Sequence, residues 1–104
     1  MLGNYVITNH VLERYEQRTN KSKKDVRSRI LRDLNRLGNK RIVYIGDYSY
    51  IFCRQPNSNV REFIVFKKNG KHIVTTVINR SSEDSDLAYK NRLRQKEEYE
   101  KSVK

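Results

Sequence analysis

The chain has 104 residues, of which 23 are Lys or Arg and 12 are Asp or Glu, so its formal net charge is +11. A chain of this length closes one hydrophobic core, which excludes multidomain enzymes. So large a positive excess attracts polyanions, and nucleic acid is therefore the first expected partner; a protein with an acidic patch is the alternative.

The positive charge is unevenly distributed along the chain. Residues 1–80 hold 17 basic and 6 acidic side chains, whereas residues 81–104 hold 6 of each, so the whole excess of +11 lies before residue 81. We expect one domain over residues 1–81 and a charged helical tail over residues 82–104. Within the tail, residues 82–102 read as a helix with few apolar positions, and this composition favours a solvated appendage.

Cysteine usage and the N-terminal sequence bear on the cellular compartment. Cys53 is the only cysteine, so it cannot form an intramolecular disulfide, and its apolar surroundings predict a small buried side chain. The N-terminus lacks a basic segment followed by an apolar stretch, and nothing approaches the roughly 18 apolar residues of a membrane span. We expect a cytoplasmic protein with no membrane partner.

Helical spacing of apolar residues marks the first 38 residues. Thr8 or Asn9 is suited to cap a first helix that runs to about Arg18. Its apolar face is formed by Val11, Leu12 and Tyr15. Ser22 begins a second helix, which ends before Gly38. The apolar positions of this second helix are Val26, Ile30, Leu34 and Leu37.

From Arg41 onward the sequence is rich in Val, Ile, Tyr, Phe and Thr, which favours strands. Four strands are predicted, at about 41–45, 48–54, 61–68 and 71–79. Asn69-Gly70 predicts a two-residue type I′ hairpin turn, because both central residues of that turn need a positive φ. A continuous ladder from this turn pairs Val65 with Val74 and Ile64 with Thr75.

The hydrophobic core is expected where the two helices cover one face of the sheet. The strand residues that we assign to it are Ile64, Phe66, Ile73 and Val77. The predicted fold class is α+β, with two N-terminal helices packed on a twisted four-stranded antiparallel sheet and a charged C-terminal helix.

Three side chains share one face of the predicted first helix. His10, Arg14 and Arg18 are spaced i, i+4 and i+8, so an imidazole and two guanidinium groups project from the same side. Stacked like charges destabilise a helix by roughly a few tenths of a kcal/mol per pair, a cost that a bound polyanion offsets. A solvated face with acidic neighbours is the alternative interpretation.

The polar side of the predicted sheet is a second candidate surface. The cations expected on it are Arg54, Arg61, Lys67 and His72. The rings expected on it are Tyr48, Tyr50, Phe52 and Phe63. Such interleaving suits nucleic acid, because cations contact phosphates while rings stack on bases. Ordinary cross-strand packing with charges at the rim is the alternative.

The two histidines suggest a reaction. RNA cleavage by the 2′-OH needs a base, an acid and cations for the developing charge, without a metal or cofactor. His10 and His72 are candidates for acid and base, Arg14, Arg54 or Arg61 for the cation, and Thr76 for a hydroxyl donor. The histidines and Cys53 lack metal-ligand spacing, and the four glycines form no phosphate-binding motif. We therefore expect no metal and no cofactor, and nucleotide-driven enzymes are excluded.

The run ITNHVLERYEQR, with His10, Arg14 and Arg18 at the start of a helix, and the later run HIVTTVI resemble a known class of domains. This is the RelE-like and barnase-EndoU-colicin class of small RNase toxins, and especially its DUF4258-type members, which open with an H-x3-R-x3-R helix. The resemblance covers residues 5–79 in element order. It implies two helices on an antiparallel sheet of about four strands, with a metal-independent RNase site on the exposed sheet face.

The resemblance also implies roles for single residues. By position, His10 and Arg14 of the first helix, Arg54 and Arg61 of the middle strands, and Thr76 of the last strand contribute to the site. RelE-like toxins often depend on Lys, Arg and Tyr instead of His. In that case Tyr48 or Tyr50 is the candidate for proton transfer.

Three functions follow from these patterns. The first is a small RNA-binding protein that acts as a metal-independent endoribonuclease of toxin or phage type, on free or ribosome-bound RNA. The second is a non-catalytic inhibitor that binds nucleic acid or a host protein. The third is an interaction module whose tail helix docks on a partner, such as an acidic protein or an antitoxin.

Overall fold

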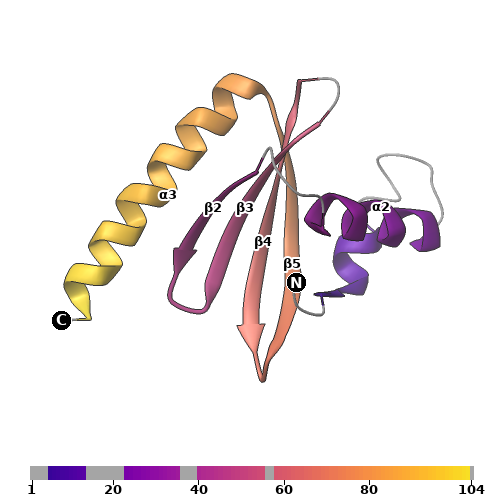
Figure 1. Cartoon of the computed structure of the whole chain (residues 1–104), viewed down its shortest axis with the longest axis horizontal. Helices are drawn as coiled ribbons and strands as arrows, with labels where there is room; N and C mark the ends of the chain where they lie inside the picture. The colour runs from indigo at the N-terminus through magenta and orange to yellow at the C-terminus, as the bar shows by residue number, and fades with distance from the viewer. Residues whose placement is uncertain (1–4, 14–22, 36–39, 56–57, 104) are drawn as a thin grey trace.

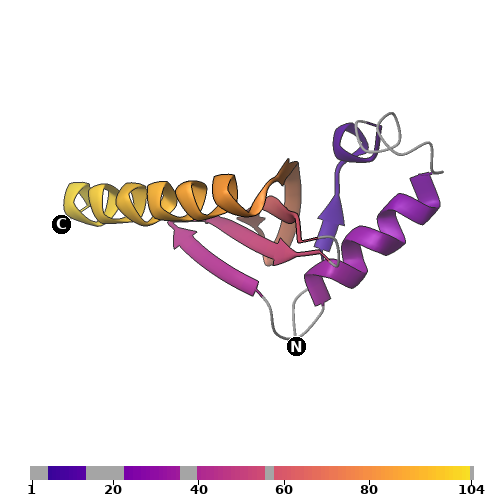
Figure 2. The same ribbon diagram turned by 90° about the horizontal axis from the view of Figure 1, so that it is seen from above.

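A computed structural model describes residues 5–13, 23–35, 40–55 and 58–103, and these residues form an α+β fold. A five-stranded mixed sheet carries the N-terminal helices on one side and a long C-terminal helix on the other (Figures 1 and 2). In chain order the elements are β1 (Tyr5–Ile7), a helical segment over 9–13, α2 (Lys23–Asn35), β2 (Lys40–Ile45), β3 (Tyr48–Arg54), β4 (Val60–Lys68), β5 (Lys71–Arg80) and α3 (Ser82–Ser102).

The strands lie in the order β1-β5-β4-β3-β2. Four of them match the predicted strands to within one residue at each end. The fifth, β1, is missing from the sequence prediction, because three residues are too few to show alternation. It pairs in parallel with β5, with Tyr5 opposite His72 and Ile7 opposite Val74. The sheet is therefore mixed and five-stranded, not antiparallel and four-stranded.

A β-bulge interrupts the pairing of β4 with β5. Both residues of the Asn69-Gly70 turn have positive φ, and the predicted register holds from this turn as far as Val74. Beyond Val74, Ile64 pairs with Thr76, because Thr75 is an extra residue in β5. The Thr75 hydroxyl donates to the Ile64 carbonyl at 3.0 Å. The predicted continuous ladder is therefore wrong past Val74.

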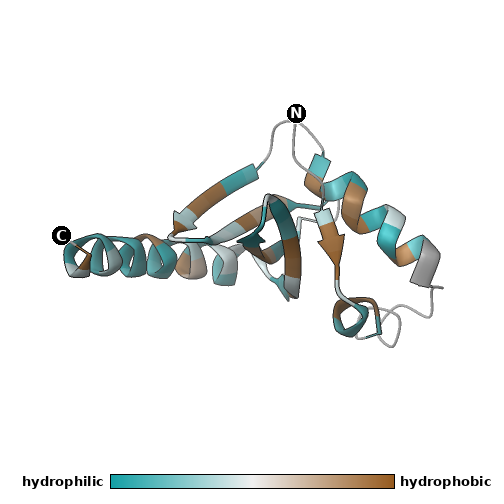
Figure 3. Cartoon of the chain, turned by 90° about the horizontal axis from the view of Figure 1, so that it is seen from below, coloured by the Kyte–Doolittle hydropathy of each residue, from teal (hydrophilic) through white to brown (hydrophobic). Residues whose placement is uncertain are grey.

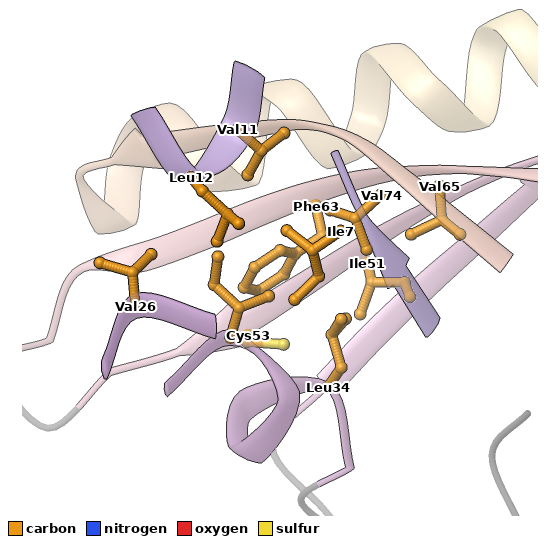
Figure 4. Packing of buried hydrophobic residues seen from close by; sticks show 11 residues of the cluster. Ile7, Val11, Leu12, Val26, Leu34, Ile51, Cys53, Phe63, Val65 and Val74 are labelled. Atoms are coloured by element: carbon orange, nitrogen blue, oxygen red, sulfur yellow. The ribbon is translucent and has the colours of Figure 1, made fainter. Parts of the chain in front are cut away.

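The main hydrophobic core lies between the sheet and the N-terminal helices (Figure 4). Its buried members are Ile7, Val11, Leu12, Val26, Ile30, Leu34, Ile51, Cys53, Phe63, Val65 and Val74. Of the strand residues assigned to this core from the sequence, Val77 packs against it. The assignment of Ile64, Phe66 and Ile73 is wrong, because these side chains alternate to the opposite side of the sheet and are only half-buried.

The first helical segment begins, and the described part of α2 packs, as the sequence predicts. The Thr8 hydroxyl accepts a hydrogen bond from the Val11 amide at 3.4 Å, and the helical segment starts at Asn9. The apolar stripe of α2 is fully buried, as expected for an amphipathic helix on a sheet. The predicted positions Arg14, Tyr15, Arg18, Ser22, Leu37 and Gly38 lie outside the described residues.

The C-terminal helix α3 packs on the sheet although most of its side chains are hydrophilic (Figure 3). Its bounds match the predicted 82–102, and the hydroxyl of Ser81 caps its first turn. It differs from the expected solvated appendage, because Ser85 and Ala88 are buried against the sheet. Ala88 joins Phe52 and Val60 in a second, smaller apolar cluster.

The far end of α3 contacts the turn between β2 and β3. Gly46 in this turn has a φ of +58°, and a Cβ at this position would lie 2.9 Å from the Tyr99 hydroxyl. Gly70 has a φ of +75° in the other hairpin turn, and nothing lies within 4 Å of its Cβ position. The two glycines share a left-handed backbone but differ in their surroundings.

We expect Gly70→Ala to lower the free energy of unfolding by about 1 kcal/mol, the cost of a left-handed backbone with a Cβ. Gly46→Ala should cost roughly 1–3 kcal/mol more, because Tyr99 must also move. Urea denaturation of both variants measures this difference. Equal losses would show that Tyr99 does not hold α3 against the turn.

Candidate nucleic-acid interface

The side of the sheet that faces α3 is called the outer face here. Strand alternation and the strand pairing place the following side chains on it: Val6, Arg41, Val43, Ile45, Tyr48, Tyr50, Phe52, Arg54, Val60, Glu62, Ile64, Phe66, Lys68, Lys71, Ile73, Thr76, Ile78 and Arg80. The opposite side, which faces the N-terminal helices, is called the core face.

Three aromatic rings form a cluster on the outer face. The Tyr48 ring lies 4.9 Å from that of Phe66 and 6.4 Å from that of Tyr50, centroid to centroid. Tyr48 is 43% exposed, and Phe66 and Tyr50 are half-buried. Beside them, Ile64 and Ile73 are also half-buried. The cluster thus offers ring surface to solvent beside half-buried apolar side chains.

Cations flank these rings on both sides. Lys68 of β4 and Lys71 of β5 lie opposite each other in the strand ladder, next to the hairpin turn, and both are exposed on the outer face. Arg54 ends β3 at the other end of the face and is also exposed. The aromatic cluster therefore lies between two positively charged regions.

A buried carboxylate joins β4, β5 and α3. Glu62 is 0% exposed, and it accepts a hydrogen bond from Arg80 at 2.7 Å and another from Arg92 at 3.0 Å. Two charge-assisted bonds balance the desolvation of a buried carboxylate that would otherwise be costly. The Arg92 guanidinium also lies 4.0 Å from the centre of the Tyr50 ring.

A second set of polar contacts joins α3 to β2. The Arg41 guanidinium donates to the Asp86 carboxylate at 2.7 Å, and it lies 4.4 Å from the centre of the Tyr89 ring. Tyr89 in turn meets Phe52 edge to face, with 5.8 Å between ring centroids. Arg41 is thus shared between the sheet and the helix.

A pocket of about 310 Å³ lies beside the first turns of α3. It is lined by Lys40, Arg41, Phe52, Arg54, Val60 and Asp86. The ammonium group of Lys40 donates to the Leu34 carbonyl, so this charge is directed toward α2. An anion in this pocket would contact the guanidinium groups of Arg41 and Arg54, next to the apolar side chains of Phe52 and Val60.

The predicted site residues divide between the two faces. Tyr48, Tyr50, Arg54 and Thr76 lie on the outer face, and Thr76 is half-buried opposite Ile64. The core face holds the other predicted strand residues: Arg61, Phe63, Lys67 and His72. The sequence prediction placed odd-numbered residues of β4 and even-numbered residues of β3 on the same face. In the structure, even-numbered residues of β3 lie opposite even-numbered residues of β4, so the odd-numbered residues of β4 point to the other face.

The residues proposed for catalysis do not form one group among those described. His10 is exposed in the first helical turn, and His72 is half-buried beside Tyr5, with 5.6 Å between ring centroids. Thr76 lies on the opposite side of the sheet from His72. Arg14 and Arg18 lie outside the described residues.

Arg61 has a structural partner on the core face. Its guanidinium donates to the Asp33 carboxylate of α2 at 2.8 Å, and Asp33 is buried. The Cys53 thiol, buried as predicted, lies 3.7 Å from the Asp33 carbonyl. The ion pair between Arg61 and Asp33 therefore joins the sheet to α2.

Sequence reasoning missed Glu62, Arg80 and Arg92, which organise the outer face. A signal for the first was present, because Glu62 is the one acidic residue within the apolar strand VREFIVFKK. A lone carboxylate in such a strand is buried only when cations satisfy it. Arg80 and Arg92 carry no comparable signal among the 23 basic residues of the chain.

We expect Glu62→Gln to lower the free energy of unfolding by about 3 kcal/mol, because it leaves two partly buried arginines facing a neutral amide. Chemical denaturation measures the loss. Glu97→Gln makes the same change on an exposed part of α3 and should leave stability within experimental error. Similar midpoints for both variants would contradict the structural role of Glu62.

Stability at alkaline pH should depend on Tyr5. Burial raises the pKa of the Tyr5 phenol above its ordinary value. The folded state therefore keeps the proton that the unfolded state loses, and stability falls as the pH rises past the ordinary tyrosine value toward the raised one. Thermal unfolding should show a shallower alkaline loss for Tyr5→Phe than for the natural sequence. Parallel alkaline curves would contradict this assignment.

The described residues contain no group of three or more His, Cys, Asp or Glu side chains placed to hold a metal ion. None of the helices in the described ranges is long and apolar enough to cross a bilayer. Comparisons with known protein families, with curated proteins and with solved structures found no match.

Proposed function

We propose that this protein binds single-stranded RNA on the outer face of its sheet. The observation that carries the proposal is the cluster formed by the exposed Tyr48 ring and the half-buried Tyr50 and Phe66 rings, between two groups of cations. Unpaired bases stack on such rings, and each stacked base contributes about 1–3 kcal/mol. Bases within a duplex are already stacked on one another, so the rings favour single strands.

The cations supply the contacts to the RNA backbone. Lys68 and Lys71 at one end, and the pocket with Arg41 and Arg54 at the other, offer phosphate sites on both sides of the rings. Contacts of this kind release counterions, so affinity falls steeply as salt is added. The net charge of +11 adds a long-range attraction that speeds encounter with RNA.

The choice of RNA over DNA, and the RelE-like architecture, rest on the resemblance of the sequence. The order of two N-terminal helices followed by strands supports this proposal, and β1 adds a fifth strand to the sheet. Endoribonuclease activity is the catalytic form of the proposal and remains a prediction. In EDTA the purified chain should produce RNA ends with 2′,3′-cyclic phosphate, and His10→Ala should abolish them. RNA that is bound but stays intact would favour the non-catalytic alternative.

A matched pair of tyrosine variants tests the interface. Tyr48→Ala should weaken binding of poly(U) by about tenfold, because one base loses its stacking partner. Tyr44 is 58% exposed but pairs with Ser49 on the core-face side, so Tyr44→Ala should leave the Kd unchanged. Fluorescence anisotropy at low salt measures both.

Equal Kd values for Tyr48→Ala and the natural sequence would remove the outer face from the interface. A larger loss for Tyr44→Ala would place the RNA on the other side of the sheet.

A further inference from the structure

We propose that α3 is a displaceable cover over part of this RNA site, and that RNA and α3 compete for the outer face above β2 and β3. The inference rests on the proposed function and concerns the regulation of the same surface. It follows from what α3 places on the sheet and from how few of its side chains are fully buried there.

The side chains of α3 occupy the positions that RNA groups would take. The Asp86 carboxylate lies on the Arg41 guanidinium at 2.7 Å, where an RNA phosphate would bind in the same way. The planar Arg92 guanidinium lies 4.0 Å from the centre of the Tyr50 ring, where a base would stack. The Asp86 carboxylate thus covers a site for a phosphate, and the Arg92 guanidinium covers a ring on which a base would stack.

The attachment of α3 is largely polar. Its buried residues are Ser85 and Ala88, both small, and the Ser85 hydroxyl has no hydrogen-bond partner among the described residues. The side chains of Arg41 and Asp86 are 40% and 56% exposed, so water and salt reach this ion pair. Exposed pairs of this kind contribute little to docking.

Release of α3 would break up the small cluster of Ala88, Phe52 and Val60 but would leave the main core intact. Every buried member of the main core comes from the N-terminal segments and strands. Glu62 would also keep its bond to Arg80 of β5 after Arg92 departs. Undocking therefore exposes Arg41, Tyr50 and Phe52 without leaving an unpaired buried carboxylate.

Hydrogen exchange of the full chain, with and without poly(U), tests the competition. We expect RNA to slow the exchange of amides in β3 and β4 and to speed the exchange of α3 over residues 88–99. Slowed or unchanged exchange in α3 while β3 is protected would overturn the cover and leave RNA binding in place. An absence of any binding at low salt would overturn the proposed function and the cover together.

A matched pair of acidic variants gives an independent readout. Asp86→Asn removes the carboxylate on Arg41 and should tighten poly(U) binding by about two- to fivefold, because Arg41 becomes free for a phosphate and the open state becomes somewhat more populated. Asp84→Asn makes the same charge change two residues earlier, at an exposed position, and controls for the general effect of charge. Equal tightening by both variants would show that only net charge acts, and would overturn the cover.

Discussion

One extra residue in β5 decides which side chains meet on each side of the sheet. Without the bulge at Thr75, alternation would place Arg80 on the core face, away from Glu62. With the bulge, Arg80 pairs with Val60 and lies on the outer face, where it binds the Glu62 carboxylate at 2.7 Å. The same shift turns Val77 toward the core. Charge balance on one face and packing on the other both depend on this residue.

The two faces of the sheet are built from different interactions. The core face is largely apolar and is covered by the N-terminal helices except toward the edge strand β2, where Ile42 and Tyr44 are exposed, and Asp33 with Arg61 forms the ion pair that ties the sheet to α2. On the outer face, rings and cations are only half covered, and α3 is attached through Arg41 and Arg92. Apolar burial holds the first layer firmly. Polar contacts hold α3 on the outer face, and a ligand with charged and aromatic groups can replace these contacts.

Much of the fold was predictable from local patterns. The stripe of α2, the Asn69-Gly70 turn and the bounds of the charged helix all follow from spacing and turn chemistry within a few residues. The core face of β4 was not predictable in this way, because both Phe63 and Phe66 stand in apolar alternations. Choosing between them requires knowing which side the helices cover, and that depends on contacts between distant segments.

The candidate site was predictable in its chemistry and not in its arrangement. Tyr48, Tyr50 and Arg54 are close together in one strand, so their common face follows from alternation alone. Adding Arg61 and His72 required the register of neighbouring strands, and a one-residue difference moves a side chain to the other face. The role of α3 was hidden because its contacts with the sheet are made by charged residues, which resemble a solvated surface in the sequence.

Side-chain methyl NMR of the full chain, titrated with a short oligo-uridine, tests the central claim most directly. The isoleucines report on both faces, because Ile64, Ile73 and Ile78 lie on the outer face and Ile42 is exposed on the other side. We predict that the outer-face methyl signals shift on titration while Ile42 stays in place. Shifts at Ile42 with unchanged signals from the outer face would contradict the proposed interface.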